Sequence, residues 1–336
     1  MYAGVMGDLV DSFGRVHRDL RISVTDRCNL RCTYCMPAEG MDWLPRSQVL
    51  TFEEIHRVVR VLVERFGIRS VRLTGGEPTV RANLDELVTA LAGIRAAGAP
   101  LDLAMTTNGT TLASCAARLA SAGLGRINIS LDSLRRERFA ELTRRDDLAD
   151  VLDGIAAALD AGFDPVKLNV VVMRGVNSDE LVDFARFGRE RGVSVRFIEF
   201  MPLDADEQWS PSAVVGQDEI VATISEEFPL EAVVRGSEPA QRFRYSDGAG
   251  EVGVIPSVTR PFCGSCDRVR LTSEGALRNC LFASEEVDLR AIMRGGGSDD
   301  DIERAVLAEV RRKGPGHAIG STTFVRPRRS MSQIGG

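Results

Sequence analysis

The strongest constraint on the fold is an alternation of short apolar runs with longer helical patterns through the first two thirds of the chain. The runs are rich in β-branched residues and bounded by turn or cap residues, so we expect strands at 19–25, 70–74, 101–107, 126–131, 166–173 and 195–200. The stretches between them have helical spacing of apolar residues, at 52–66, 83–98, 112–123, 146–162 and 178–192. Successive β/α units predict an α/β fold with a parallel sheet and right-handed crossovers. Because six units fall short of eight, we expect a partial (βα)6 TIM-like barrel.

After about residue 205 the pattern changes. One more helix is expected within 210–228, and short strand-like pieces at 242–246, 251–256 and 268–272 are separated by Gly and Pro. We therefore expect a smaller C-terminal α+β unit, which divides the chain into 12–205 and 206–336. By composition alone, the polar and basic end at 321–336 would be a frayed tail.

Charge and hydropathy exclude several classes of protein. The formal net charge is −6, from 42 Lys+Arg and 48 Asp+Glu, which argues against a nucleic-acid partner but allows a local basic pocket. The N-terminus lacks the pattern of a secretory signal, and no apolar run is long enough to cross a membrane. We therefore expect a cytoplasmic protein, in which clustered thiols stay reduced.

Six of the seven cysteines form two groups of three. Cys28, Cys32 and Cys35 have C-x3-C-x2-C spacing directly after the first strand, at the end of a barrel strand where active sites lie. A structural zinc would need a fourth ligand, and no histidine lies in this loop. A four-iron cluster held by three thiolates leaves one iron open for a small molecule. A zinc knuckle or redox-active thiols are the alternatives.

The second group is Cys263, Cys266 and Cys280, with C-x2-C-x13-C spacing. Taken alone, it fits a zinc ribbon with a missing ligand equally well. Beside the first group it indicates a second open-iron cluster. Cys115 stands among alanines in a helical stretch, so we expect it to be an inert core residue.

The first cysteine motif, with a Tyr before its third Cys, resembles that of the radical S-adenosylmethionine (SAM) enzymes. Further motifs in order make the chain similar to the GTP 3′,8-cyclase family of molybdenum cofactor biosynthesis, from about residue 12 to the last residue. These motifs are TGGEPTVR (74–81), TTNG (106–109), ISLDSL (129–134), KLNVVVMRGVN (167–177), FIEFMPL (197–203), CDRVRLT (266–272) and IGG (334–336). The resemblance implies a partial barrel of the radical SAM type, two [4Fe–4S] clusters and SAM.

The resemblance also implies a reaction. Reductive cleavage of SAM gives a 5′-deoxyadenosyl radical, which takes the 3′ hydrogen of GTP. The C3′ radical then bonds to C8 of guanine and yields (8S)-3′,8-cyclo-7,8-dihydroguanosine 5′-triphosphate. Implied partners are an electron donor of the flavodoxin or ferredoxin type, a downstream cyclic pyranopterin monophosphate synthase, and a second copy of the chain in a homodimer.

Matched motifs assign residues to SAM. Gly75 and Gly76 allow close backbone approach, and Glu77 supplies a charge for the methionine ammonium group. Tyr34 is expected to face the adenine. The full set implied for SAM is Tyr34, Gly76, Glu77, Ser130 and Met201.

GTP carries about four negative charges, so its pocket must be basic, and arginine suits phosphate because its fork is bidentate. Arg72 lies two residues before Thr74, and Arg268 two before Arg270, so each pair faces one side of its strand. The set implied for GTP is Arg21, Arg72, Thr106, Lys167, Arg196, Arg268, Val269 and Arg270. The second cluster is expected to hold the guanine at its open iron.

The catalytic set implied by the resemblance is Arg21, Gly335 and Gly336, with the double glycine entering the active site. Two other functions remain open at this point. One is a radical enzyme that acts on a peptide through an auxiliary cluster; the arginines and the IGG end argue against this function. The other is a zinc-stapled binding protein.

Overall fold

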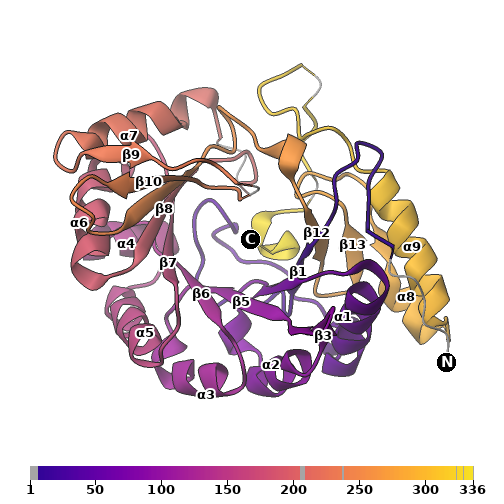
Figure 1. Ribbon diagram of the computed structural model, residues 1–336. Helices are drawn as coiled ribbons and strands as arrows, with labels where there is room; N and C mark the ends of the chain where they lie inside the picture. Colours follow the sequence, from indigo (N-terminus) through magenta and orange to yellow (C-terminus); the bar gives the residue numbers. More distant parts are fainter. Residues whose placement is uncertain (1–6, 205–208, 237, 323, 328, 336) are drawn as a thin grey trace.

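A curved sheet of parallel strands forms an open ring with helices on its outer side (Figure 1). The structure is a computed structural model that describes residues 7–204, 209–236, 238–322, 324–327 and 329–335. All six expected strands are present, with ends within two residues of the expected ones. They are β1 (Asp19–Ser23), β2 (Ser70–Thr74), β5 (Asp102–Thr107), β6 (Arg126–Ser130), β7 (Val166–Val172) and β8 (Ser194–Glu199).

Helices follow the strands and cover the outer face of the ring. They are α1 (Phe52–Phe66), α2 (Leu84–Ala92), α3 (Ala116–Ser121), α4 (Arg136–Thr143), α5 (Leu148–Asp160) and α6 (Leu181–Arg191). Helix α1 begins with a complete capping box, because Thr51 and Glu54 each accept a hydrogen bond from the other's backbone N–H. Its buried side is apolar and packs into the layer between helices and sheet, where most of the core lies.

Two helical predictions are wrong in detail. The helix expected at 83–98 ends at Ala92, and a hairpin of β3 (Arg95–Ala96) and β4 (Ala99–Pro100) replaces its last turns. The turn between these strands has positive φ at Ala97 and Gly98, which a helix cannot accommodate. Cys115 lies between a 3-10 turn and α3 rather than inside a helix, and is half-buried against the core.

The segment after residue 205 completes the same sheet at both of its edges. Strand β11 pairs in parallel with β8, and β12 pairs in parallel with β1. Eight parallel strands therefore run in the order β12-β1-β2-β5-β6-β7-β8-β11. The C-terminal elements are α7 (Gln217–Ser225), β9 (Leu230–Ala232), β10 (Gln241–Tyr245), β11 (Glu251–Ile255), β12 (Arg268–Leu271), β13 (Ala276–Arg278), β14 (Val287–Asp288), α8 (Leu289–Arg294), α9 (Asp299–Arg311) and α10 (Met331–Ile334).

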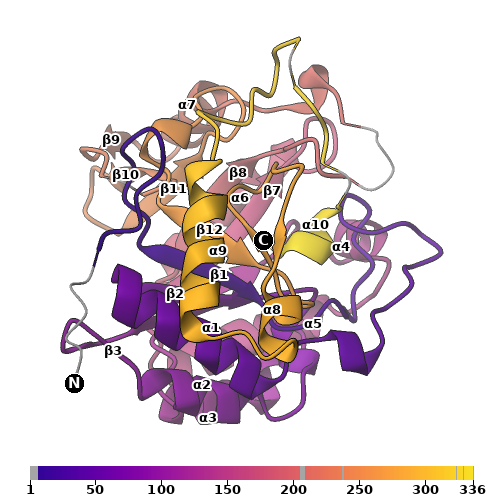
Figure 2. The same cartoon turned by 90° about the vertical axis from the view of Figure 1, so that its right-hand side faces the viewer.

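Ion pairs join helix α1, near the start of the chain, to helix α9, near its end. Helix α9 lies along α1 (Figure 2), and Asp299 at its start accepts hydrogen bonds from Arg57 at 2.8 Å and Arg60 at 2.6 Å. Helix α10 turns back into the ring (Figure 1). Within the described ranges, no helix combines the length and the apolar character that a membrane span requires.

Candidate active site

One cavity inside the ring is lined by both cysteine groups and by buried cations. Its walls include Cys28, Cys32 and Cys35 from the loop after β1, and Cys263, Cys266 and Cys280 from the C-terminal segment. Arg21, Arg72, Arg268 and Arg270 line the same space. Residues from both parts of the chain therefore line a single cavity.

The first cysteine group lies on a tight loop. The backbone N–H of Cys35 donates to the carbonyl oxygen of Cys32 at 2.9 Å, and all three thiols are free of disulfides. Burial raises the pKa of Cys28 to about 11 and that of Cys35 to about 12, so these thiolates need a positive partner. In the described part of the chain, no three His, Cys, Asp or Glu side chains converge as ligands of one metal ion. The thiolates of an iron–sulfur cluster bind separate irons and need no such convergence.

The glycine pair after β2 presses against the loop that carries Cys28. A Cβ at Gly76 would lie 2.3 Å from the carbonyl oxygen of Arg27, and one at Gly75 would lie 2.5 Å from that of Thr25. The Gly76 N–H donates to the Thr25 carbonyl at 2.8 Å. Only glycine allows this approach, as the motif predicts.

Glu77 is completely buried and is held by donors of the chain itself. Its carboxylate accepts from Thr79 N–H at 3.0 Å, from the Thr79 hydroxyl at 2.5 Å, from the Thr107 hydroxyl at 2.7 Å and from Asn108 N–H at 2.6 Å. Burial raises its pKa, and these hydrogen bonds act against that rise. Glu77 thus fastens the end of β2 to the end of β5, and its contact with a methionine ammonium group stays a prediction.

The other residues expected to meet SAM lie on the wall of the same cavity. Ser130 at the end of β6 and Met201 after β8 both line the cavity. The Tyr34 hydroxyl donates to Asp132 at 2.5 Å, and its ring packs edge-on against Phe200. The tyrosine ring is therefore fixed at one wall of the cavity, whatever part of a ligand it meets.

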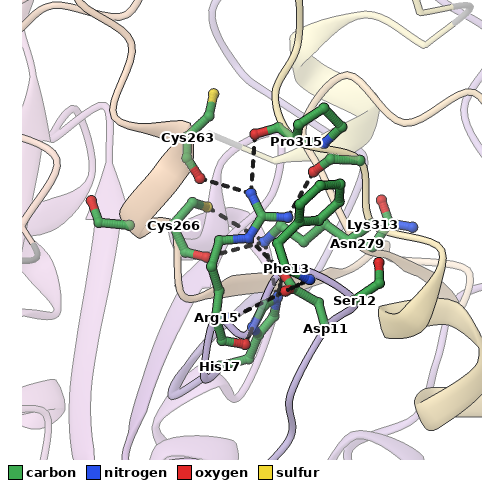
Figure 3. A network of polar contacts seen from close by, with 12 residues as sticks. Asp11, Ser12, Phe13, Arg15, His17, Cys263, Cys266, Asn279, Lys313 and Pro315 are labelled. Atoms are coloured by element: carbon green, nitrogen blue, oxygen red, sulfur yellow. Dashed lines mark hydrogen bonds and ion pairs between the residues drawn. The ribbon is translucent and has the colours of Figure 1, made fainter.

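The second cysteine group is held by the N-terminal segment (Figure 3). Arg15 donates to the carbonyl oxygens of Cys263 at 2.8 Å and Gly314 at 2.6 Å, while Asp11 accepts from the Arg15 Nε at 2.6 Å. Burial alone would raise the pKa of Cys266, but Arg268 and Lys313 outweigh it and bring the pKa to about 7. Positive charge therefore surrounds this thiol before any ligand binds.

Three arginines stand side by side across neighbouring strands. Arg21 on β1 is in register with Arg270 on β12 and with Arg72 on β2. Burial, with the neighbouring charges of Arg268 and Arg72, lowers the pKa of Arg21 to about 9. Among the described residues, the Nε atoms of Arg21, Arg72 and Arg268 are buried without a hydrogen-bond partner. Unpaired buried donors of this kind call for an anionic ligand.

A second group of cations lies further along the sheet. Burial and then the charges of Arg196, Arg126 and Arg72 lower the pKa of Lys167 to about 8. Arg196 is nine-tenths buried and 3.7 Å from Glu238. Lys167 and Arg196 lie outside the lining of the main cavity, whereas Thr106 is part of it.

Val269 is a third predicted GTP residue outside the cavity lining, and it faces the core. Its side chain is completely buried in the core on the face of β12 opposite to Arg268 and Arg270. Only its backbone could meet a ligand. Strand alternation predicts this orientation, because Val269 stands between two cavity-facing arginines.

The C-terminal tail enters the ring (Figure 1). Arg270 Nη1 donates to the carbonyl oxygen of Gly335 at 2.5 Å, and the Ser23 hydroxyl donates to that of Ile334 at 3.0 Å. Gly335 has φ +80°, and a Cβ there would lie 2.2 Å from the Ser23 hydroxyl oxygen. Gly336 lies outside the described residues.

Sequence reasoning missed several polar residues of the cavity. Asn128 on β6 and Asn169 on β7 line it, and each has a buried Oδ1 without a partner in the described structure. Ser332 of the tail also lines it, close to Cys35. The sequence could have indicated both asparagines as cavity residues, because each is a polar residue at an alternate position of an otherwise apolar strand.

Comparison with known proteins identifies the class. A sequence model of the Radical SAM superfamily matches residues 22–188, and one named Molybdenum Cofactor Synthesis C matches residues 193–319. The computed structure resembles Streptococcus suis SuiB bound to its precursor peptide SuiA, with TM-score 0.61 and 13% identity over 88% of this chain and 67% of that one. SuiB bound to S-adenosylmethionine gives TM-score 0.58 and 14% identity, covering 82% of this chain and 65% of that one. Fold and site together thus define a radical SAM protein.

Curated relatives narrow the family. A GTP 3′,8-cyclase of Mycobacterium sp. (strain KMS) is 50% identical over 332 residues, which cover 98% of this chain and 94% of the relative. A GTP 3′,8-cyclase of Corynebacterium glutamicum (strain ATCC 13032) is 48% identical over 336 residues, covering 98% and 89%. The chain belongs to the GTP 3′,8-cyclase family. Membership of the superfamily implies SAM and one [4Fe–4S] cluster as cofactors.

Proposed function

We propose that this chain is a GTP 3′,8-cyclase that catalyses the first step of molybdenum cofactor biosynthesis. It would join C3′ of the ribose of GTP to C8 of the guanine and form (8S)-3′,8-cyclo-7,8-dihydroguanosine 5′-triphosphate. The observation that carries the proposal is a set of cations that line the same cavity as both cysteine groups. Among them, Arg21, Arg72 and Arg270 are in register on three neighbouring strands. A polyanion of nucleotide size is the ligand that these charges favour.

We propose that Cys28, Cys32 and Cys35 hold a [4Fe–4S] cluster with SAM, and that Cys263, Cys266 and Cys280 hold a second cluster. The placement of all six unpaired thiols on one cavity supports this assignment. When bound, the first cluster and SAM supply the one-electron chemistry that generates the hydrogen-abstracting radical. The protein binds, orients and shields the substrate.

The chain's own residues divide this work by position. Lys167, Arg72 and Arg196 form one cationic group and would take the triphosphate. Burial lowers the pKa of Lys167 and of Arg72, and the nearby charges of Arg196 and Arg126 lower both further, so an anion here would be favoured. Arg21, Arg268 and Arg270 lie beside the second cysteine group and would hold the nucleoside end. This orientation keeps the ribose between the two cysteine groups, where its 3′ hydrogen can be reached.

The tail would close the site. Gly335 and Ile334 are hydrogen-bonded to Arg270 and Ser23, so the end of the chain excludes water from the space beside the arginines. We propose that the double glycine and Arg21 take part in the cyclisation step. Excluding water protects a radical from side reactions.

An anaerobic assay tests the function. The reconstituted protein is given SAM, a reductant and each nucleoside triphosphate in turn, and 5′-deoxyadenosine is measured. We expect formation with GTP only, and with GTP deuterated at C3′ we expect one deuterium in the 5′-deoxyadenosine. Formation with a peptide and without GTP would instead support a peptide-modifying radical enzyme. Two bound zinc ions with no iron would support a binding protein and contradict the cyclase.

Several expectations rest on the family resemblance alone and remain proposals. They are a cytoplasmic location, an electron donor of the flavodoxin or ferredoxin type, a downstream cyclic pyranopterin monophosphate synthase and a homodimer. The assay above can distinguish electron donors, because flavodoxin or ferredoxin can replace the chemical reductant.

A further inference from the structure

Lys313 is a buried lysine next to the second cysteine group, and neither the sequence motifs nor the proposed reaction gives it a role. Its side chain is 3% exposed and lies just after α9, in the network drawn in Figure 3. The chain contains only one other lysine, Lys167, and its other long cationic side chains are arginines. Burying an ammonium group is costly, so its partners must explain it.

The partners of Lys313 fix its charge and direction. Its Nζ donates to the carbonyl oxygen of Arg268 at 2.8 Å and lies 3.1 Å from His17 Nε2 and 3.5 Å from Cys266 Sγ. A protonated amine has three N–H groups, one each for Arg268, His17 and Cys266, whose carbonyl oxygen also lies 3.4 Å from Nζ. A neutral amine would direct its lone pair at one of these acceptors. The arrangement therefore suits an ammonium ion with one N–H pointing at the sulfur.

His17 accepts from this ammonium group rather than competing with it. Its Nδ1 lies 3.2 Å from the carbonyl oxygen of Arg15, which can only accept, so Nδ1 carries the hydrogen and Nε2 is free to accept. Burial and the charge of Lys313 lower the pKa of His17 to about 4, so the ring is neutral at pH 7. The histidine thus holds the ammonium group in place without adding charge.

We propose that Lys313 is a positioning residue of the second cluster: its ammonium group holds a fixed positive charge against Cys266 Sγ and raises the cluster's reduction potential. The inference rests on the proposed second [4Fe–4S] cluster. Reduction adds negative charge to the cluster, and a nearby cation and a hydrogen bond to sulfur favour that state. Because Lys313 is shielded from water, its charge is screened less than that of an exposed lysine.

Two substitutions at Lys313 and one near it test the proposal. Lys313→Met removes the charge with little change in length, and Lys313→Arg keeps it. Arg311→Met removes an equal charge at an exposed position in the last turn of α9, where solvent screens it. Midpoint potentials are measured by anaerobic redox titration followed by electron paramagnetic resonance. The titration uses the holoenzyme and a Cys28/Cys32/Cys35→Ala background that keeps only the second cluster.

We expect a lower midpoint potential for the second cluster in Lys313→Met, and nearly wild-type values in Lys313→Arg and Arg311→Met. A full iron content with an unchanged potential in Lys313→Met would overturn the proposal. Loss of the second cluster's iron in both Lys313 variants would also overturn it, because Lys313 would then only hold the loop. Failure of the second cluster itself is recognised separately, since wild-type protein would then bind about four irons instead of about eight.

Discussion

Arg270 Nη1 donates a hydrogen bond of 2.5 Å to the backbone carbonyl oxygen of Gly335, and this contact joins β12 to the tail inside the ring. The arginine is only 5% exposed, and burial, followed by the charges of Arg21 and Arg268, lowers its pKa well below the usual value. A carbonyl group is a weak partner for such a cation. The tail and an anionic ligand can therefore share Arg270, so tail docking and substrate binding are expected to be linked.

Gly335→Ala should abolish cyclisation while leaving the fold and iron content intact. A Cβ there would lie 2.2 Å from the Ser23 hydroxyl oxygen and 2.5 Å from that of Thr74, so the tail could not seat. Gly320→Ala is the matched control, because Gly320 has φ +83°, like the +80° of Gly335, but open space around its Cβ position. GTP-dependent 5′-deoxyadenosine and cyclised product are measured, and an active Gly335→Ala enzyme would refute the role of the tail.

GTP binding should weaken as the pH rises above about 8, because Lys167 loses its proton there. At pH values where Lys167 is neutral in the free protein but protonated in the GTP complex, the affinity for GTP can fall up to about tenfold per pH unit. Lys167→Arg should remove the dependence between pH 7 and pH 8.5, since arginine stays charged. Calorimetric titration with GTP at several pH values checks this, and equal slopes for both proteins would count against the assignment.

The lowered pKa of Lys167 also makes the free energy of unfolding depend on pH, and this quantity rises with pH where GTP affinity falls. The pKa of Lys167 is about 8 in the folded chain, below the ordinary 10.5, so the unfolded chain binds more protons between these values. Lys167 therefore contributes a free energy of unfolding that increases with pH across this window. Chemical denaturation at pH 7.5 and 9.5 compares the free energy of unfolding of wild type and Lys167→Met. The difference between the two proteins should narrow at the higher pH.

Glu77→Gln should lower the free energy of unfolding by about 2–4 kcal/mol, because an amide nitrogen would face donors that now meet a buried carboxylate. The substituted amide has one accepting oxygen for the donors from Thr79, Thr107 and Asn108. Glu226→Gln, at an exposed position of α7's C-cap, should have almost no effect. Urea unfolding compares them, and a neutral result for Glu77→Gln would show that its hydrogen bonds are dispensable.

Arg15→Gln should selectively weaken the second iron–sulfur site. The guanidinium of Arg15 links Asp11 to the carbonyl oxygens of Cys263, Gly314 and Pro315, so its loss frees the cysteine loop (Figure 3). Arg18→Gln is the control, because the Arg18 guanidinium donates to the carbonyl oxygens of Phe66 and Gly67 at the end of α1 and pairs with Asp8. Iron analysis should show up to half of the iron lost only in Arg15→Gln; equal loss in both would point to general destabilisation.

Local patterns were enough to predict much of the fold and site. The six strands follow from their apolar runs, and the cavity-facing arginines follow from two-residue alternation on β2 and β12. The helix predicted at 83–98 failed because the turn at Ala97 and Gly98 overrides helix propensity. Local pattern also placed Val269 between two arginines, although the family resemblance alone suggested it as a ligand residue.

The sequence by itself determined the order of strands and helices, the two cysteine groups and the family, because each is encoded in neighbouring residues. Only the tertiary structure decided that β11 and β12 complete opposite edges of one sheet, since strand pairing over long distances leaves no local signal. The same holds for Lys313, a single residue just after α9. Its role depends on His17 and Cys266, which lie far from it in the chain and meet it only when the N-terminal segment packs against the second cysteine loop.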